Sequence, residues 1–171
     1  MTKPLLVVGV ALLILAGCAA PAPPDYAAQA KPALDAFMAR WSAGNLDGLD
    51  AAIAPNFQRH SPGGFVADGL PASKKVVTDL RTSFPDVKVV LEESDFMKDM
   101  SFHLWTFTGT NTGPGAMPPT GKSAKVSGTT RIRYQDGKII DELVYFDALD
   151  FQQQLGFTLT PPASTPAAAS T

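Results

Sequence analysis

The sequence predicts an α+β domain in which N-terminal helices pack on one face of a curved antiparallel sheet. Apolar residues recur at helical spacing in the first part of the domain, and they alternate with polar residues in the second part. A run of helices followed by a run of strands is typical of α+β proteins. The turn sequence Asp136-Gly137 separates the last two strand patterns and indicates that these strands pair as a hairpin.

Three helices are predicted ahead of the strands. The first covers residues 33–43, where the apolar side chains at helical spacing are Leu34, Phe37, Met38 and Trp41. The second is a short helix over residues 47–53 that ends near Pro55. The third covers residues 70–84 and ends at a proline, and the apolar residues on its one side are Val76, Val77, Leu80 and Phe84.

Four strands follow, and the pattern predicts them over residues 87–93, 101–110, 125–134 and 138–146. Alternation along a strand assigns its side chains to two faces. In the second of these strands, one face carries His103, Trp105 and Phe107, and Asn111 continues that face beyond the strand end. We expect this face to point into the domain.

The last strand has apolar side chains on both faces. One face carries Asp141, Leu143, Tyr145 and Asp147, and the other carries Ile140, Val144 and Phe146. Glu142 has the opposite parity to Asp147, so it is predicted to be a charge on the outer face or at an interface. Because an apolar sheet face is unfavourable in water, we expect a second subunit to cover the outer face, in a homodimer or higher homo-oligomer.

The N-terminus resembles an export signal. Lys3 precedes an apolar run over residues 5–16, which is too short to span a bilayer but has the length of a signal-peptide core. The run ends in Leu-Ala-Gly-Cys, which resembles the lipobox of bacterial lipoproteins. We therefore predict a signal peptide over residues 1–17 and lipidation of Cys18. The mature protein would be exported and anchored to the outer membrane or to the outer face of the inner membrane. The alternatives are an ordinary signal peptide with an incidental cysteine and an uncleaved membrane anchor.

Low-complexity segments flank a single domain. Residues 18–32 are rich in alanine and proline and are predicted to be a tether, residues 33–158 form the domain, and residues 159–171 are predicted to be a disordered tail. The chain has 14 Lys and Arg against 16 Asp and Glu, and none of the basic residues form a block. This distribution argues against nucleic acid as a partner. The chain has 2 histidines and no carboxylate cluster to match them, so no metal site is predicted.

Short motifs occur along the domain in a characteristic order. They are His60-Ser-Pro-Gly-Gly, Phe84-Pro85-Asp86, Gly109-Thr110-Asn111-Thr112-Gly113, Pro118-Pro119-Thr120-Gly121-Lys122, Gly137-Lys138-Ile139, and Asp147 with Gln154-Leu155-Gly156. In this order they resemble the SnoaL-like polyketide cyclases, also called ester cyclases, over about residues 33–157. The resemblance implies a cone-shaped α+β barrel with a central pocket, shared with nuclear-transport-factor-type proteins and ketosteroid isomerases. It also implies oligomers formed through the outer sheet face.

The resemblance further implies chemistry without a cofactor: an intramolecular aldol closure of a polyketide ester with an aspartate as acid and base. On the family pattern this residue is Asp147. A free Asp carboxyl has a pKa of about 3.9, so it acts as a base only where apolar surroundings raise that pKa. The residues that could supply such surroundings are Trp105, Phe107, Leu143, Tyr145 and Phe146. The alternative role of Asp147 is to cap a helix that begins at Ala148.

Three other polar residues are candidates for the site. His103 could polarise a carbonyl or shuttle a proton, or it could be a hydrogen-bonded core histidine. Asn111 stands where many relatives carry histidine; its amide can donate to a developing enolate but cannot exchange a proton at neutral pH. His60 lies in a loop expected at the pocket mouth. Leu143 stands where relatives often carry tryptophan, and this change is expected to enlarge or reshape the wall of the pocket.

The sequence therefore predicts a membrane-anchored protein that binds a small apolar carbonyl compound, with aldol-type cyclisation or isomerisation as its chemistry. The expected catalytic residues are Asp147, His103 and Asn111, and the expected substrate contacts are His60, Trp105, Phe107, Leu143 and Tyr145. A non-catalytic ligand-binding or accessory envelope lipoprotein is the alternative, favoured by the change at position 111 and by export away from acyl-carrier machinery. A third alternative is a purely structural dimeric envelope module.

Overall fold

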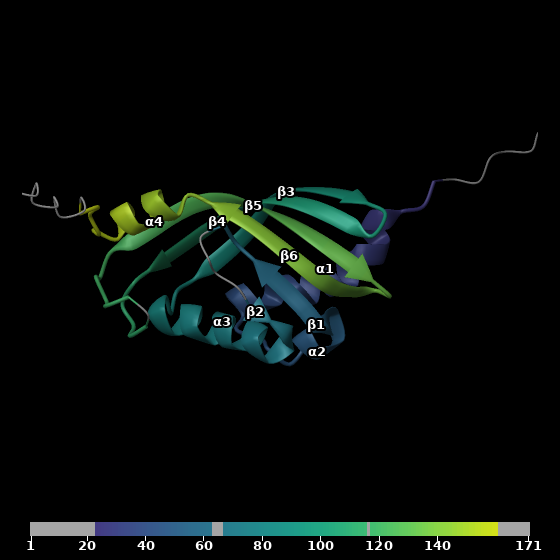
Figure 1. The fold of residues 1–171 in the computed structure, drawn as a ribbon, viewed down its shortest axis with the longest axis horizontal. Coiled ribbons are helices and arrows are strands. Elements are labelled where there is room, and N and C mark those ends of the chain that lie inside the picture. Colours follow the sequence, from purple (N-terminus) through teal and green to yellow (C-terminus); the bar gives the residue numbers. More distant parts are fainter. Residues whose placement is uncertain (1–22, 63–66, 116, 161–171) are drawn as a thin grey trace, which may run out of the picture.

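The computed structural model describes residues 23–62, 67–115 and 117–160 (Figure 1). The predicted signal peptide, Cys18 and nearly all of the predicted tail lie outside these residues. A six-stranded sheet of order β2-β1-β6-β5-β4-β3 curves over three helices that lie on its concave side. The α+β prediction is confirmed. The sheet is open, with β2 and β3 at its edges, and α1, α2 and α3 close the concave side.

The first helix begins earlier than the sequence pattern predicts. Helix α1 spans Tyr26–Ser42, so residues 26–32, which were predicted as part of the tether, are helical. Asp25 caps the helix, and its side chain accepts a hydrogen bond from Ala28 N at 2.9 Å. Pro32 lies inside the helix. The cap and the alanine-rich first turns favour the helix, and the proline does not prevent it.

The region after α1 contains a strand that the pattern did not predict. Helix α2 is a single turn over Leu49–Ala52, and strand β1 follows at once over Ile53–His60. Strand β1 pairs in parallel with β6 and antiparallel with the short β2 (Ala67–Asp68). A register irregularity between residues 53 and 58 breaks the alternation of buried side chains in β1, which is why the alternation test missed it.

The remaining elements agree with the prediction, with small shifts at their ends. Helix α3 spans Gly69–Ser83, and the strands are β3 (Lys88–Met97), β4 (Met100–Thr110), β5 (Ser123–Gln135) and β6 (Lys138–Phe146). A last helix, α4, spans Ala148–Gln154. Asp136 and Gly137 have φ values of 51° and 74°, which confirms the predicted hairpin turn.

Two apolar clusters fill opposite ends of the concave side. One joins α1 and α2 to β1 and the adjoining ends of β5 and β6, through Phe37, Leu49, Phe57 and Ile139 among others. The other gathers Phe84, Phe107, Val126 and Leu155 near α4. The space between the two clusters holds the cavity described below. None of the helices in the described part of the chain is both long enough and apolar enough to cross a membrane.

Candidate functional site

A cavity of about 430 Å³ lies between the concave face of the sheet and helices α1 and α3. Its wall is mainly apolar and includes Phe37, Trp41, Leu80, Leu91, Trp105, Phe107, Val126, Ile132, Val144 and Phe146. The polar groups that reach it are few, and the charged ones are Arg59, Asp79 and Glu142. A concave, apolar site with a small number of polar groups is typical of small-molecule binding sites.

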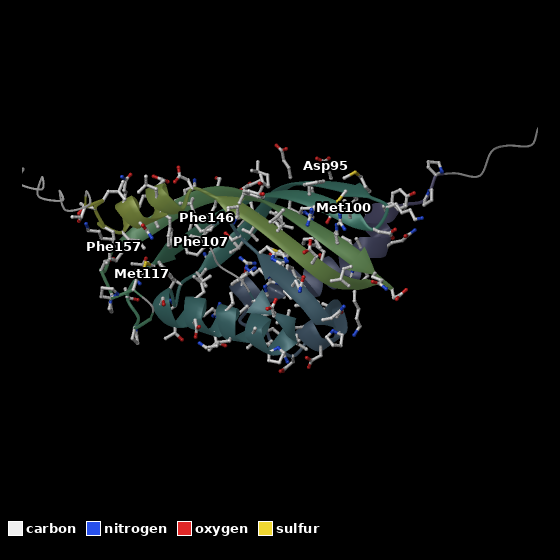
Figure 2. All side chains as sticks on the ribbon, in the orientation of Figure 1. Asp95, Met100, Phe107, Met117, Phe146 and Phe157 are labelled. Carbon is white, nitrogen blue, oxygen red and sulfur yellow. The ribbon has the colours of Figure 1, made fainter. Side chains whose placement is uncertain are left out.

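Aromatic rings build the end of the cavity nearest α4. Phe107 meets Phe84 and Phe151 edge-on, with ring centroids 5.5 and 5.7 Å apart, and Phe146 lies 6.2 Å from Phe151. Phe107 and Phe146 are labelled in Figure 2. Such edge-to-face pairs add to the stability that burial of the rings supplies. Trp105 donates from Nε1 to Thr130 Oγ1 at 2.8 Å, which fixes the indole against the sheet. The alternation of β4 therefore placed Trp105 and Phe107 on the correct face.

The predicted faces of β6 are reversed. Glu142, Val144 and Phe146 line the cavity, whereas Leu143 and Tyr145 lie on the outer face, where Tyr145 is 50% exposed. Leu143 and Tyr145 are therefore not wall residues, and Glu142 is not an outer-face charge. The sequence could not decide between the faces, because both faces of β6 carry apolar residues.

A buried charge cluster occupies the end of the cavity near α1. Arg40 is 1% exposed and Glu142 4% exposed. Arg40 Nη2 donates to both carboxylate oxygens of Glu142 at 3.3 Å, and Arg59 Nη1 forms a short ion pair with Glu142 Oε2. The guanidinium of Arg40 lies over the Phe37 ring, 3.1 Å from its centroid, and 4.5 Å from that of Trp41. Sequence reasoning missed this cluster; its one signal is an arginine between the two aromatic residues of an apolar helix stripe.

Burial of the cluster weakens the proton affinity of its deepest member. Desolvation lowers the pKa of Arg40 to about 9, with a smaller contribution from the charge of Arg59 in the same direction, while Glu142 acts against the shift. Arg40 is therefore still a cation at neutral pH. Two nitrogen atoms of Arg40, Nε and Nη1, are buried without a hydrogen-bond partner among the residues that the structure describes.

His103 lines the cavity from β4 but has both ring nitrogens engaged. Nδ1 lies 2.8 Å from Ser94 Oγ, and Nε2 lies 2.7 Å from Ser101 Oγ, which in turn lies 2.8 Å from the Tyr134 hydroxyl. Burial lowers the pKa of His103 to about 4, although Glu142 and Asp95 act against the shift. The imidazole is thus neutral at pH 7. This arrangement matches the alternative of a hydrogen-bonded core histidine.

Comparison with known families identifies the kind of protein that carries this cavity. The family model of the SnoaL-like polyketide cyclases matches residues 31–155. The chain belongs to the SnoaL-like family. No curated protein matches the chain. Membership supports small-molecule binding of the kind found among cofactor-free cyclases and isomerases.

Solved structures support the same fold. A protein from Jannaschia sp. CCS1 named as a SnoaL-like polyketide cyclase is 19% identical, with 78% of this chain and 97% of that chain covered and a TM-score of 0.66. A protein from Acidithiobacillus ferrooxidans named as a polyketide cyclase is 30% identical, with coverages of 74% and 94% and a TM-score of 0.62. A protein from Catenulispora acidiphila with a ketosteroid isomerase-like fold is 17% identical, with coverages of 75% and 97% and a TM-score of 0.63.

In this SnoaL-like protein, Asp147 lies outside the cavity. It is the N-cap residue of α4, and its Oδ1 accepts a hydrogen bond from Asp150 N at 2.8 Å. The side chain is exposed at the point where the chain leaves β6 and turns into the helix. The structure thus places Asp147 in the capping role that was its alternative, because an aspartate at this position satisfies a free N–H group of the first turn.

Asn111 and His60 also lie apart from the cavity wall. Asn111 is fully buried, accepts from Thr120 N at 2.9 Å and donates from Nδ2 to Ser83 O at 3.3 Å. It therefore joins the β4–β5 connection to the end of α3. His60 is 43% exposed, and its Nε2 lies 3.5 Å from Asp141 Oδ2. The residues before and after it, Arg59 and Ser61, line the cavity.

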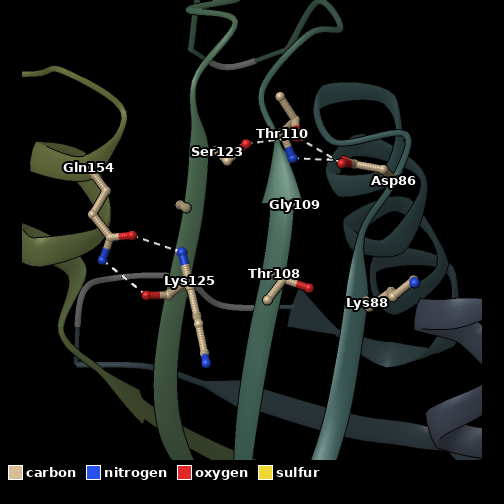
Figure 3. A pocket seen from close by; sticks show the side chains of 9 residues that line it. Asp86, Lys88, Thr108, Gly109, Thr110, Ser123, Lys125 and Gln154 are labelled. Carbon is tan, nitrogen blue, oxygen red and sulfur yellow. Dashed lines mark hydrogen bonds between the residues drawn. The ribbon is translucent and has the colours of Figure 1, made fainter.

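A second, shallow pocket lies over β3, β4 and β5 (Figure 3). Its polar groups are largely bonded to one another. Asp86 accepts from Thr110 N and Thr110 Oγ1 at 2.7 and 2.8 Å, and these hydrogen bonds lower the pKa of Asp86. The side-chain amide of Gln154 accepts a hydrogen bond from Lys125 N through Oε1 at 2.8 Å and donates one from Nε2 to Lys125 O at 3.0 Å. These contacts hold α4 and the connection between α3 and β3 against the sheet. Over residues 23–62, 67–115 and 117–160, no three His, Cys, Asp or Glu side chains are grouped to hold a metal ion.

Proposed function

We propose that this SnoaL-like protein binds a small, largely apolar carbonyl compound in the cavity between the sheet and helices α1 and α3. The observation that carries the proposal is the wall itself, in which aromatic and aliphatic side chains predominate over polar ones. Burial of apolar ligand surface against such a wall supplies the affinity, and the few polar groups orient the ligand.

Acid and base chemistry at Glu142 is a second candidate function. Two carboxylates line the cavity. Asp79 is exposed and pairs with Lys75 at 2.6 Å, whereas Glu142 is buried at the inner end. Proton transfer to or from a bound carbonyl compound would therefore fall to Glu142 rather than to Asp147. If the protein turns over such a compound, Glu142→Gln should remove the turnover and Asp147→Asn should leave it intact.

Binding is tested with a neutral apolar dye, N-phenyl-1-naphthylamine, whose fluorescence rises in an apolar site. Val144→Phe places a larger side chain in the cavity, and Leu143→Phe places the same side chain one residue away on the outer face. We expect Val144→Phe to weaken dye binding about tenfold or more and Leu143→Phe to leave it unchanged, with thermal melts to verify that both variants are folded. Equal binding by both variants would contradict a site in the cavity.

We further propose that Cys18 is acylated and that it anchors the protein to the cell envelope. The support is the lipobox-like sequence that ends at Cys18. Few residues separate Cys18 from the cap of α1 at Asp25, so the anchor would hold the cavity close to the membrane surface. Labelled palmitate should enter the full-length protein in a bacterial host, and Cys18→Ser should abolish the label. A labelled Cys18→Ser protein would overturn the proposal.

We also propose that the protein forms a homodimer through the outer face of the sheet. Exposed apolar side chains on this face are Val90, Phe102, Leu104 and Tyr145. Leu104, Thr129 and Tyr145 form one cross-strand row, because Leu104 pairs with Thr129 and Thr129 with Tyr145. Sedimentation of the soluble domain should give a dimer at micromolar concentration and a monomer for Leu104→Glu. A wild-type monomer under those conditions would refute it.

A further inference from the structure

Thr130 lies in the middle of the sheet face that lines the cavity. On β5 it pairs with His103 of β4 and with Val144 of β6, so these three residues form one row across the sheet. All three line the cavity, and Thr130 is 6% exposed. Thr130 therefore brings a buried hydroxyl group to a wall that is otherwise mainly apolar.

Trp105 fixes the direction of this hydroxyl group. Its Nε1 donates to Thr130 Oγ1 at 2.8 Å. The indole lies against Gly128, where an added Cβ atom would overlap the ring, so the absence of a side chain there makes room for it. Because an indole nitrogen is a donor only, Thr130 is the acceptor in this hydrogen bond, and its own hydrogen points elsewhere.

The hydroxyl hydrogen of Thr130 has no acceptor among the residues that the structure describes. His103 is not one, since serine hydroxyls engage both of its ring nitrogens. The other described hydroxyls of the wall differ from Thr130. Ser83 donates to a backbone carbonyl of α3 at 3.0 Å, and Ser61 is only partly buried. Thr130 is thus the buried hydroxyl of the wall that still has a hydrogen to donate.

A bound apolar molecule gives this donor an energetic consequence. Such a molecule displaces water from the cavity, and a buried O–H group without an acceptor is costly. A ligand oxygen beside Thr130 removes that cost, whereas a hydrocarbon of the same shape does not. The hydrogen bond from Trp105 also polarises the hydroxyl group, which makes it a stronger donor.

We propose that Thr130 binds the oxygen of a ketone or ester carbonyl in the ligand by donating its hydroxyl hydrogen to that oxygen. This inference deepens the proposed function and rests on it, since it assumes that the cavity binds a small apolar molecule. A carbonyl oxygen fits the role because it accepts hydrogen bonds and has no hydrogen of its own to place in the apolar wall.

The neighbours of Thr130 indicate where this carbonyl lies in the ligand. The adjacent row toward α4 contains Trp105 and Phe146, which both line the cavity. On the other side, Ile132 follows Thr130 on the same face of β5. The carbonyl therefore lies between apolar surfaces, which matches a ketone or ester within a carbon skeleton.

The test compares a ketone with the hydrocarbon of the same skeleton. 2-Tetralone and tetralin compete with N-phenyl-1-naphthylamine for the cavity, and the measured quantity is the inhibition constant of tetralin divided by that of tetralone. Comparing this ratio between variants cancels the different hydrophobicity of the two compounds. Thr130→Val keeps the shape of the side chain and removes the hydroxyl group. We expect the ratio to fall about tenfold in Thr130→Val.

Two further variants separate hydrogen bonding from packing. Thr130→Ser keeps the hydroxyl group and should keep the ratio, although it removes a methyl group. Thr129→Val is the matched control, because Thr129 is exposed on the outer face of β5, and it should leave both inhibition constants unchanged. Thermal melts verify folding. Should Thr130→Val fail to fold, Thr130→Ala removes the same hydroxyl group and takes its place.

The infrared stretch of the bound tetralone carbonyl reads the hydrogen bond directly. A donated hydrogen bond lowers the stretching frequency, so the frequency should rise in Thr130→Val and stay at the wild-type value in Thr130→Ser and Thr129→Val.

The outcomes separate this inference from the proposed function. If the dye binds and Thr130→Val changes neither the ratio nor the frequency, or if the ratio falls equally in Thr130→Ser, the inference is overturned while the proposed cavity function stands. If the dye does not bind, the proposed function itself fails.

Discussion

The buried histidine of β4 makes the stability of this SnoaL-like protein depend on pH in a defined range. The pKa of His103 is lowered to about 4 in the folded protein, while an unfolded histidine has a pKa of about 6.5. Between these two pH values the unfolded chain binds a proton at this position and the folded chain does not. The free energy of unfolding therefore rises with pH across this range. The contribution of neutral His103 to that free energy is lost as the pH falls toward 4.

The size of the effect follows from the two pKa values. A difference of about 2.5 pKa units corresponds to about 3 kcal/mol, which is a large part of the stability of a small domain. Above about pH 6.5 the contribution is complete and constant, and below about pH 4 it is absent. The physical cause is the removal of the imidazole from water in a site where Ser94 and Ser101 already satisfy both nitrogens.

Urea unfolding at several pH values between 4 and 8 measures this contribution. The carboxylates of the protein also titrate at the lower end, so the informative quantity is the difference between wild type and His103→Gln. We expect this difference to shrink by about 3 kcal/mol from pH 7 to pH 4. His60→Gln is the control for loss of an imidazole at a site that is 43% exposed. A constant difference between wild type and His103→Gln at all pH values would refute the reasoning.

Three further predictions concern residues that the structure places differently from the sequence. Glu142→Gln removes the buried carboxylate that pairs with both Arg40 and Arg59 and should cost about 3–5 kcal/mol in urea unfolding, whereas Asp141→Asn, in a partly exposed pair, should cost about 1 kcal/mol or less. Asp147→Ala removes the cap of α4 and should cost about 1 kcal/mol without changing dye affinity, and a dye affinity that falls tenfold would restore Asp147 to the site. Asn111→Ala should cost about 1–2 kcal/mol, measured the same way, because it removes two buried side-chain hydrogen bonds, while Thr120 N and Ser83 O each keep a backbone partner. A change within 0.5 kcal/mol, roughly the spread for surface substitutions, would contradict that role.

The sequence was a good guide where one face of an element was distinctly apolar. Helix α3 and strands β3 to β6 follow from periodicity, and the Asp136-Gly137 turn fixes the last hairpin. The alternation of β4 also identified Trp105 and Phe107 as cavity residues. In these segments local preference and tertiary burial agree, and the pattern is therefore visible in a single sequence.

Periodicity was insufficient where the burial of a side chain depends on how two segments of the chain pair. The inner face of β6 is set by its pairing with β5, in which Glu142 lies opposite Ile132 and Val144 opposite Thr130. No property of β6 alone distinguishes that face, since Leu143 and Tyr145 are as apolar as Val144 and Phe146. The capping role of Asp147 follows from the same pairing, because β6 ends at Phe146 and the next residue begins the turn into α4.

The charge cluster is formed by residues that only the folded chain brings together. Arg40 and Glu142 are 102 residues apart, and each looks like a surface charge when its own segment is considered alone. Arg59 lies in β1, the strand that the pattern missed, so its inward direction was not predictable either. Three residues from three elements thus meet only when the sheet curves over α1. Buried charges of this kind serve specificity or function in some proteins. Because the charge cluster lies at one end of an apolar cavity, it is the first part of this protein to probe for ligand recognition, ahead of Asp147.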